Sequence, residues 1–306
     1  MTCCAPNSGR SASASLPSFA PDRPRETVDA VLVAGGHSFV GTANPVITID
    51  GESPERPVRL SDYFLEATTV TVERFAQFIS ATNYVTEAEQ FGWSSVFVGR
   101  DNGPGEAVGT GLSWWHRVEG ANWRQPEGPD STVKDRMTHP VTQVSARDAE
   151  AFALWVGGRL PSEAEWEHAA RGGSKRRRFP WGDEEPGDDA ILCNIWQGNF
   201  PTVNTALDGY TGTAPARSFA PSELGFYNMV GNVWEWTAEP FQLRSMSSGA
   251  RARNATARRN RERLLKGGSF LCHKTYCYRY RIAARMALSA DSSASNVGFR
   301  IAFNAS

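Results

Sequence analysis

Glycine and proline occur throughout the body of this chain, and they limit the length of any helix or strand that it can form. The 306 residues include 28 glycines and 18 prolines, together with ten tryptophans. Glycine and proline interrupt regular elements, whereas aromatic side chains supply large apolar surfaces for burial. We therefore predict many turns, short strands and a core that depends on aromatic packing.

Three segments have the periodicity and capping residues of helices. Residues 71–83 place apolar side chains on one helical face. A second helix is predicted from Ser145, an N-cap with an acid three residues later, to Gly157. The third is the clearest, because Ser162 opens a capping box and Gly172 follows the last apolar residues.

Strands are predicted where apolar residues alternate between turn residues. These stretches are VLVAGGHSF (31–39), PVITID (45–50), PVRLSDYFLEATTV (57–70), LLKGGSF (264–270) and VGFRIAF (297–303). Residues 240–263, rich in Ser, Ala and Arg, are expected to form a mobile insertion. Without a repeat or an internal linker, the chain is predicted to form one α+β domain over residues 29–306, after a disordered leader over residues 1–28.

Charge and cysteine content narrow the possible partners and location. The 32 basic and 33 acidic residues give a formal net charge of -1, which offers no field to attract nucleic acid or an anionic membrane. No stretch approaches the roughly 18 apolar residues of a membrane helix, and the leader lacks the apolar core of a secretory signal. Five cysteines are too few for a disulfide scaffold, so we expect a reducing, cytoplasmic location.

Two cysteines, Cys272 and Cys277, lie five positions apart in the stretch SFLCHKTYCYRYR, residues 269–281. A helix would rotate the second side chain about 140° from the first. An extended strand would place the two on opposite faces, about 16 Å apart. They can therefore meet only if HKTY forms a turn. A pair that meets can form a disulfide, hold a soft metal ion, or cycle as a redox pair.

The residues around the pair leave these alternatives open. A structural bridge or two inert buried thiols is the interpretation that the residues alone favour. Against it, Lys274, Arg279 and Arg281 could lower the pKa of the thiols. Two sulfur ligands suit Cu(I), whereas zinc usually requires four ligands.

Oxygen-bearing side chains gather in the stretches NIWQGNF, LDGY and YNMVGNVWEW. Asn194, Asp208, Asn228 and Glu235, with neighbouring carbonyl groups, could bind hard cations such as Ca²⁺. No contiguous EF-hand pattern is present, so the residues alone favour the simpler interpretation that Asn, Asp and Gly make turns.

Motifs of several common enzyme classes are missing from the sequence. The five histidines are scattered and include no His-x-x-x-His or His-Glu-x-x-His pair, which argues against a histidine iron site or a catalytic zinc site. There is also no G-x-S-x-G elbow, no P-loop, and no G-x-G-x-x-G after a strand.

Longer strings of the sequence carry a family resemblance. They are GPDST (128–132), RLPSEAEWEHAARGG (159–173), NIWQGNFP (194–201), GFYNMVGNVWEWT (225–237), KGGSFLCHKTYCYRYR (266–281) and SSASNVGFRIA (292–302). Together they resemble the formylglycine-generating enzyme family over about residues 30–304. RLPSEAEWE and GNVWEW are similar to strings found across a broader superfamily. CHKTYCYRYR resembles the active-site segment of the true oxidases.

The resemblance implies both a fold and a reaction. The fold would be a single domain with low regular secondary-structure content, similar to the C-type lectin fold, acting as a monomer. The reaction would oxidise the cysteine of a CxPxR motif, in an unfolded or nascent sulfatase polypeptide, to Cα-formylglycine. It would consume O₂ and a thiol reductant.

Roles for particular residues follow only from this resemblance. Cys272 and Cys277 would carry Cu(I), with Ser269 and Trp234 lining the oxygen pocket. Substrate would be bound by Asp130, which offers a carboxylate to the motif arginine, and by Ser131, His273 and Tyr276. Structural Ca²⁺ would be held at two sites, one formed by Asn194, Ile195, Asp208 and Tyr210, and the other by Asn228, Gly231, Val233 and Glu235.

One departure from the family pattern affects stability and location. Ala153, Ala170, Ile282 and Ile301 stand where vertebrate relatives are expected to carry extra disulfide cysteines, so apolar packing would replace the bridges. This is typical of a bacterial, cytoplasmic member. Two other functions stay open: a non-catalytic peptide- or sugar-binding module of the same fold, and a copper-free thiol-disulfide oxidoreductase.

Overall fold

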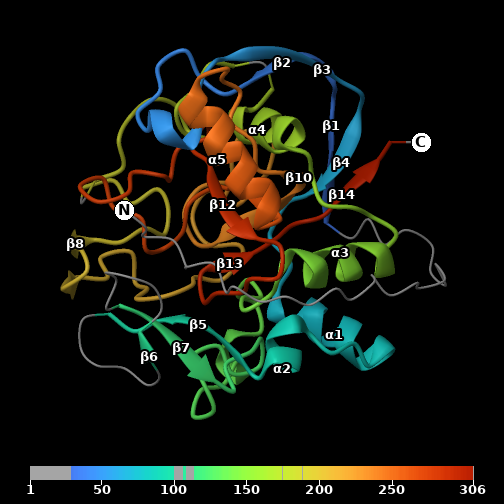
Figure 1. Ribbon diagram of the computed structural model, residues 1–306, viewed down its shortest axis with the longest axis vertical. Coiled ribbons are helices and arrows are strands. Elements are labelled where there is room, and N and C mark those ends of the chain that lie inside the picture. The colour runs from blue at the N-terminus through green and yellow to red at the C-terminus, as the bar shows by residue number, and fades with distance from the viewer. Residues whose placement is uncertain (1–28, 100–105, 108–113, 174, 188, 306) are drawn as a thin grey trace.

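Short helices with well-formed caps are joined by long irregular connections (Figure 1). The computed structural model describes residues 29–99, 106–107, 114–173, 175–187 and 189–305, so the predicted leader lies outside the described residues. Helices α1 (Val72–Thr82), α3 (Ala146–Trp155) and α4 (Glu163–Arg171) form where the sequence predicts them. The capping boxes of α3 and α4 are both present, and Gly172 ends α4 with φ of 70°.

Two helices were not predicted. Helix α2 (Glu87–Phe91) is a single short stretch with its own capping box. Helix α5 (Ser248–Arg259) occupies the segment that the sequence predicts to be a mobile insertion, and that prediction is wrong. Alanine and arginine favour helix, and Ala250, Asn254 and Ala257 form a buried face without the large apolar residues that would have revealed it.

The strands form several small sheets instead of one large one. One sheet has the order β1 (Ala30–Val33), β4 (Tyr63–Glu66), β14 (Ala302–Asn304), and a second has the order β12 (Met286–Ser289), β11 (Glu262–Lys266), β10 (Trp234–Pro240), β13 (Val297–Gly298). A third has the order β5 (Trp93–Phe97), β7 (Trp115–Glu119), β6 (Glu106–Ala107). Two further sheets are strand pairs, β2 (Gly36–Val40) with β3 (Arg56–Leu60) and β8 (Gly198–Asn199) with β9 (Val203–Asn204). Pairing is antiparallel except between β10 and β13. The predicted strand at 45–50 is wrong, because a 3₁₀ turn, η1 (Thr48–Asp50), forms there, and a second, η2 (Lys134–Arg136), lies further on.

Aromatic side chains fill the main core, as the composition predicts. Phe75 packs against Phe78, Phe152 and Phe299 at ring-centroid distances of 5.5, 6.0 and 6.3 Å. The four residues at the expected vertebrate cysteine positions are fully buried in the same core: Ala153, Ala170, Ile282 and Ile301. Apolar packing at these positions is therefore confirmed.

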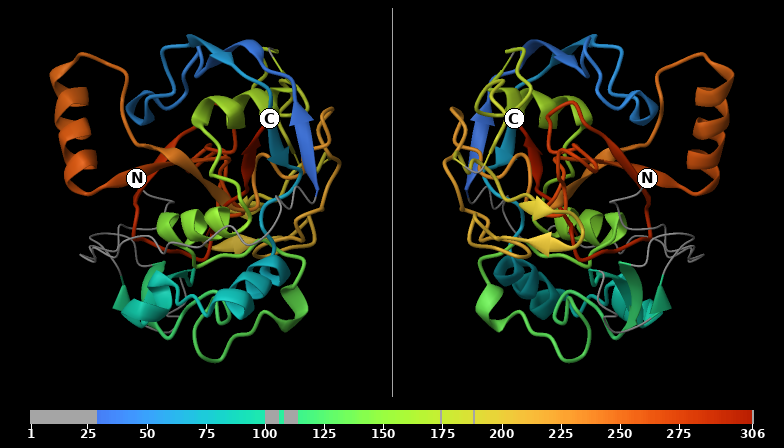
Figure 2. Two further views of the ribbon diagram at one scale, coloured as in Figure 1. Left: turned by 90° about the vertical axis from the view of Figure 1, so that its right-hand side faces the viewer. Right: turned by 90° about the vertical axis from the view of Figure 1, so that its left-hand side faces the viewer.

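The central sheet positions the cysteine loop. Strand β10 pairs with both β11 and β13, and the chain leaves β11 directly into residues 267–281. Helix α5, which precedes β11, lies at the edge of the molecule and extends away from the body (Figure 2). Among the described residues, no helix combines the length and the apolar character that a bilayer span requires.

Candidate active site

In the loop after β11, Cys272 and Cys277 stand on either side of a turn. The carbonyl oxygen of His273 accepts hydrogen bonds from the amides of Tyr276, Cys277 and Tyr278, at 3.0, 2.9 and 3.1 Å. At the start of the loop, a Cβ on Gly268 would lie 2.9 Å from the Cα of Tyr280, so the two ends of the loop pack against each other. The turn at HKTY that a meeting of the two cysteines requires is therefore present.

Both cysteines of this loop are buried, with 1% and 3% of their surface exposed. Cys193, Cys272 and Cys277 carry thiols, not disulfides. Burial raises the pKa of Tyr280, and nearby Glu185 raises it further. In the described part of the chain, no three or more His, Cys, Asp and Glu side chains form a group that could hold a metal ion. A metal at the loop would therefore depend on two thiolates, the donor set that Cu(I) accepts.

Cys193 differs from the other two in its surroundings. Burial raises the pKa of its thiol, and the nearby Asp208 raises it further. A thiol held in its neutral form is a poor nucleophile and a poor metal ligand. Cys193 therefore acts as a small buried apolar residue, with 2% exposure.

Asn296 connects the two residues expected to line the oxygen pocket. Its side-chain NH₂ group donates to Ser269 Oγ at 2.9 Å. Its main-chain carbonyl oxygen accepts from the main-chain amide of Trp234 at 2.9 Å. The Ser269 amide in turn approaches Cys272 Sγ at 3.4 Å. Asn296 Oδ1 and Trp234 Nε1 are buried without a hydrogen-bond partner, so both can bind an incoming polar atom. The sequence showed Asn296 only as part of a string, without a role.

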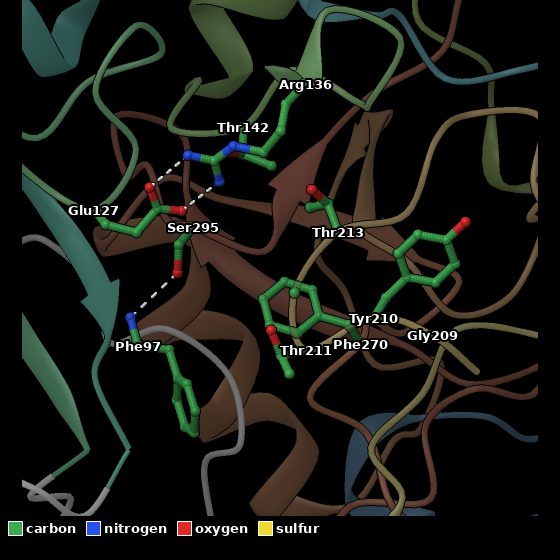
Figure 3. A pocket seen from close by; sticks show the side chains of 11 residues that line it. Phe97, Glu127, Arg136, Thr142, Gly209, Tyr210, Thr211, Thr213, Phe270 and Ser295 are labelled. Atoms are coloured by element: carbon green, nitrogen blue, oxygen red, sulfur yellow. Dashed lines mark hydrogen bonds and ion pairs between the residues drawn. The ribbon is translucent and has the colours of Figure 1, made fainter. Parts of the chain in front are cut away.

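A cavity of about 420 Å³ lies between the predicted substrate segment and the cysteine loop (Figure 3). Glu127, next to the GPDST string, and Phe270, next to Ser269, line the same space. Arg136 holds the Glu127 carboxylate through two hydrogen bonds of 2.6 and 2.7 Å. Sequence reasoning did not find this ion pair.

Asp130 and Ser131 lie in a tight turn at this edge. Ser131 Oγ donates to the Gly128 carbonyl at 2.7 Å and accepts from the Glu127 amide at 3.0 Å, which links the turn to the cavity wall. Asp130 is exposed, and the described residues place no cation within ion-pair distance of its carboxylate. It is therefore accessible to a positively charged ligand.

His273 and Tyr276 lie on the outer side of the turn. His273 Nδ1 shares a 2.7 Å hydrogen bond with Thr275 Oγ1, and Tyr276 stacks on Phe200 with ring centroids 4.4 Å apart. A second cavity, of about 270 Å³, is lined by His273, Cys193 and Tyr280 among others. Cavities thus approach the cysteine loop from two sides, although neither is lined by Cys272 or Cys277 itself.

The first expected calcium set offers oxygen atoms that nothing else binds. Asn194 Oδ1 and Asp208 Oδ2 are buried without a hydrogen-bond partner. Burial raises the pKa of Asp208, an effect that a bound cation would reverse. Ile195 could contribute only its main-chain carbonyl oxygen to a cation. Tyr210 could contribute its main-chain carbonyl oxygen as well, without its phenol taking part. These donors fit a hard cation.

The second expected set fits less completely. Asn228 Oδ1 is buried without a partner, and Asn228 and Gly231 have φ of 48° and 78°. Val233 is buried and could offer only its carbonyl oxygen. The Glu235 carboxylate, however, already accepts from Arg300 Nε and Nη2 at 2.7 and 2.8 Å and from an indole N–H. A cation here would have to share Glu235 with that arginine.

Comparison with known proteins assigns the chain to a family. The model of the sulfatase-modifying factor enzyme 1-like domain matches residues 17–305, so the chain belongs to that family. A formylglycine-generating enzyme of Thermomonospora curvata is 46% identical over 300 residues, which cover 94% of this chain and 99% of that enzyme. The inactive C-alpha-formylglycine-generating enzyme 2 of Bos taurus is 38% identical over 288 residues, or 92% of this chain and 89% of that protein.

Solved structures confirm the fold. PvdO from Pseudomonas aeruginosa superimposes with a TM-score of 0.57 and 22% identity, over 90% of this chain and 94% of that chain. At that identity the likeness shows the fold alone. The predicted α+β domain with little regular secondary structure is confirmed.

Proposed function

We propose that this chain oxidises the cysteine of a CxPxR motif in an unfolded sulfatase polypeptide to Cα-formylglycine. The observation that supports the proposal is the turn that separates the buried Cys272 and Cys277, in a loop whose Phe270 lines the same cavity as Glu127, close in sequence to Asp130. The 46% identity to a named formylglycine-generating enzyme supports the same reaction. Five cysteines in the chain and the need for a thiol reductant favour the cytoplasm.

The balance of the reaction determines its co-substrates. The substrate CH₂–SH group loses two electrons and becomes CHO, with sulfur leaving as H₂S and one oxygen atom entering the aldehyde. Reduction of O₂ takes four electrons, so the other two, with two protons, come from a thiol reductant, and water is the second product. Cys272 and Cys277 would hold Cu(I), which would supply the redox chemistry of this reaction when bound.

The residues of this chain would bind and orient the peptide. Asp130 would pair with the motif arginine at the exposed edge, and the 420 Å³ cavity would take the chain toward the cysteine loop. The Ser269 amide contacts Cys272 Sγ, and Asn296 contacts Ser269, so the thiol lies in a buried setting that would limit the access of water. Exclusion of water prevents side reactions of the oxidised sulfur.

The test of this function is conversion of a CxPxR peptide with Asp130 and the peptide arginine varied in a double-mutant cycle. With copper, O₂ and a reductant present, mass spectrometry should detect the aldehyde. Asp130→Asn should raise KM about tenfold or more with little change in kcat, because one charge-assisted hydrogen bond contributes about 1.5–3 kcal/mol. With the unmodified protein, a CxPxQ peptide should show a similar increase in KM. Combining this peptide with Asp130→Asn should raise KM little further, because both changes remove the same interaction.

The matched control for this cycle is Asp135→Asn, which removes an exposed carboxylate from the same segment. It should leave KM unchanged. If the losses from Asp130→Asn and from CxPxQ are additive, Asp130 does not bind the arginine. If no aldehyde forms under any condition, the chain is a non-catalytic member, as its inactive relative is described to be.

Calcium should stabilise the protein through Asn194 and Asp208. At a calcium concentration of about 100 times Kd, the free energy of unfolding should rise by about 2.7 kcal/mol relative to protein in a chelator. Differential scanning calorimetry would measure the corresponding rise in Tm. Asp208→Asn should abolish most of this response, whereas Asp135→Asn should keep it. An equal calcium response in all three proteins would contradict the assignment.

A further inference from the structure

Helix α5 and the loop before it concentrate positive charge. Residues 240–261 contain six arginines and no Asp, Glu or Lys, although the whole chain has a formal net charge of -1. The arginines are Arg244, Arg251, Arg253, Arg258, Arg259 and Arg261. The positive charge is therefore local to one side of the molecule, where α5 extends from the body (Figure 2).

Most of this charge is not neutralised by the residues that the structure describes. Arg253 pairs with Glu262 at 2.6 Å and lies over the Phe241 ring. The other five arginines are exposed, and no carboxylate of the described residues lies within ion-pair distance of them. By contrast, the basic run at 175–178 is matched by carboxylates, through ion pairs of Lys175 and Arg177 with Glu223, Arg176 with Glu55 and Arg178 with Glu185. The difference indicates that α5 presents charge to a partner.

Three of these arginines surround a groove of about 500 Å³, called here the α5 groove. Arg251 and Arg258 are seven residues apart, so they lie on one face of the helix about 10.5 Å apart. Arg244 faces them from the loop, and Leu243 and Met246 supply apolar surface between the charges. Met246 is 84% exposed and so is accessible to a ligand in the groove.

The α5 groove is held in shape before any ligand binds. Asn254, on the buried face of α5, accepts a hydrogen bond from the Leu243 amide at 2.7 Å and donates one to the Leu243 carbonyl at 3.0 Å. Arg285 donates to the Gln242 carbonyl at 3.1 Å. The loop that carries Arg244 is therefore fixed to the helix and to the domain core. A preformed groove reduces the entropy cost of binding.

We propose that the α5 groove binds an extended acidic segment of a partner polypeptide, with carboxylates three residues apart and an apolar residue between them. In a segment with the extended polyproline II conformation, which has three residues per turn and rises about 3.1 Å per residue, residues i and i+3 lie on one face about 9 Å apart, close to the spacing of Arg251 and Arg258. The apolar residue would contact Leu243 and Met246. This inference concerns a surface outside the cysteine site and does not depend on the proposed reaction.

Nucleic acid fits the α5 groove less well. The described lining of the groove includes no aromatic ring on which a base could stack. The apolar surface of Leu243 and Met246 also has no counterpart in a phosphate backbone. With a net charge of -1, the chain as a whole does not attract polyanions over a distance.

Fluorescence anisotropy with a labelled peptide, Glu-Leu-Ala repeated four times, tests the proposal on the full chain. The peptide should bind, and the same peptide with Gln in place of Glu should bind about tenfold more weakly or worse, since three exposed ion pairs are lost. Arg244→Gln, Arg251→Gln and Arg258→Gln combined should give a similar loss. The same three positions changed to Lys should retain most of the affinity, because the charge remains.

A control variant and a second probe distinguish the alternatives. Arg59→Gln, Arg117→Gln and Arg176→Gln combined remove equal charge from other exposed positions and should leave Kd unchanged. Equal loss in this control would overturn the proposal in favour of a general charge effect. Tighter binding of a single-stranded RNA of equal charge, lost in the α5 variant, would overturn it in favour of nucleic acid. Absence of peptide binding at low salt would also overturn it.

Discussion

Replacing Cys272 with serine is expected to lower formylglycine formation by more than about a hundredfold without unfolding the protein. Removing a partner that only supports a metal ligand commonly costs 10–100-fold, and Cys272 is proposed as a ligand itself. A hydroxyl is a hard, protonated donor that does not replace a thiolate on Cu(I). Because serine is nearly the size of cysteine, this site with 1% exposure should keep its packing. Cys277→Ser should behave in the same way.

Cys193→Ser is the matched control for this prediction. Cys193 is also buried, also lies close to Tyr280, and receives the same chemical change. It should retain most of the activity, measured as aldehyde by mass spectrometry at equal copper and with folding checked by circular dichroism. If Cys272→Ser is as active as Cys193→Ser, the thiol pair is not the reactive centre. Activity that persists with a tight Cu(I) chelator would instead favour a copper-free redox pair.

Replacing Arg300 with alanine is expected to cost about 3–5 kcal/mol of the free energy of unfolding. Arg300 is fully buried and donates through Nε and Nη2 to both oxygens of Glu235. Its remaining hydrogen bonds reach the main-chain carbonyls of Glu66, Ala67 and Tyr227. One side chain therefore links the end of β4, strand β10 and the loop that contains Tyr227. Alanine would leave the Glu235 carboxylate buried without its charge partner. Urea unfolding followed by fluorescence would measure the loss.

Two further variants show whether the loss comes from the buried charge. Lys175→Ala breaks an exposed ion pair with Glu223 and should cost less than about 1 kcal/mol. Adding Glu235→Gln to the Arg300→Ala protein should restore part of the stability, because the uncompensated charge is then gone. A double variant that is less stable than Arg300→Ala alone would contradict this explanation.

The predicted helices succeeded where the signal was local. Ser145 and Ser162 sit three residues before an acid, and the capping boxes they form are hydrogen bonds between near neighbours in the sequence. Helix α5 was missed because its buried face consists of small and polar residues. The apolar side chains that cover it, Phe241 and Leu264, come from outside the helix.

In the candidate site, too, local features could be inferred from the sequence, whereas contacts between distant segments could not. The spacing of Cys272 and Cys277 showed only that a turn is required if their side chains are to meet, and the structure has that turn. Asn296 could not be assigned a role, because its contact with Ser269 joins residues 27 positions apart. The wall that Glu127 and Phe270 share likewise depends on the packing of distant segments. Contacts of this kind depend on the tertiary fold and leave no periodic signal.

The most direct test of the central claim is a titration of the protein with Cu(I) in competition with a chromogenic chelator. One tightly bound ion per chain is expected in the unmodified protein and in Cys193→Ser. No tight binding is expected in Cys272→Ser or Cys277→Ser. Undiminished tight binding of Cu(I) after either of those two substitutions would contradict the claim that the two buried thiols of this loop together form the metal site.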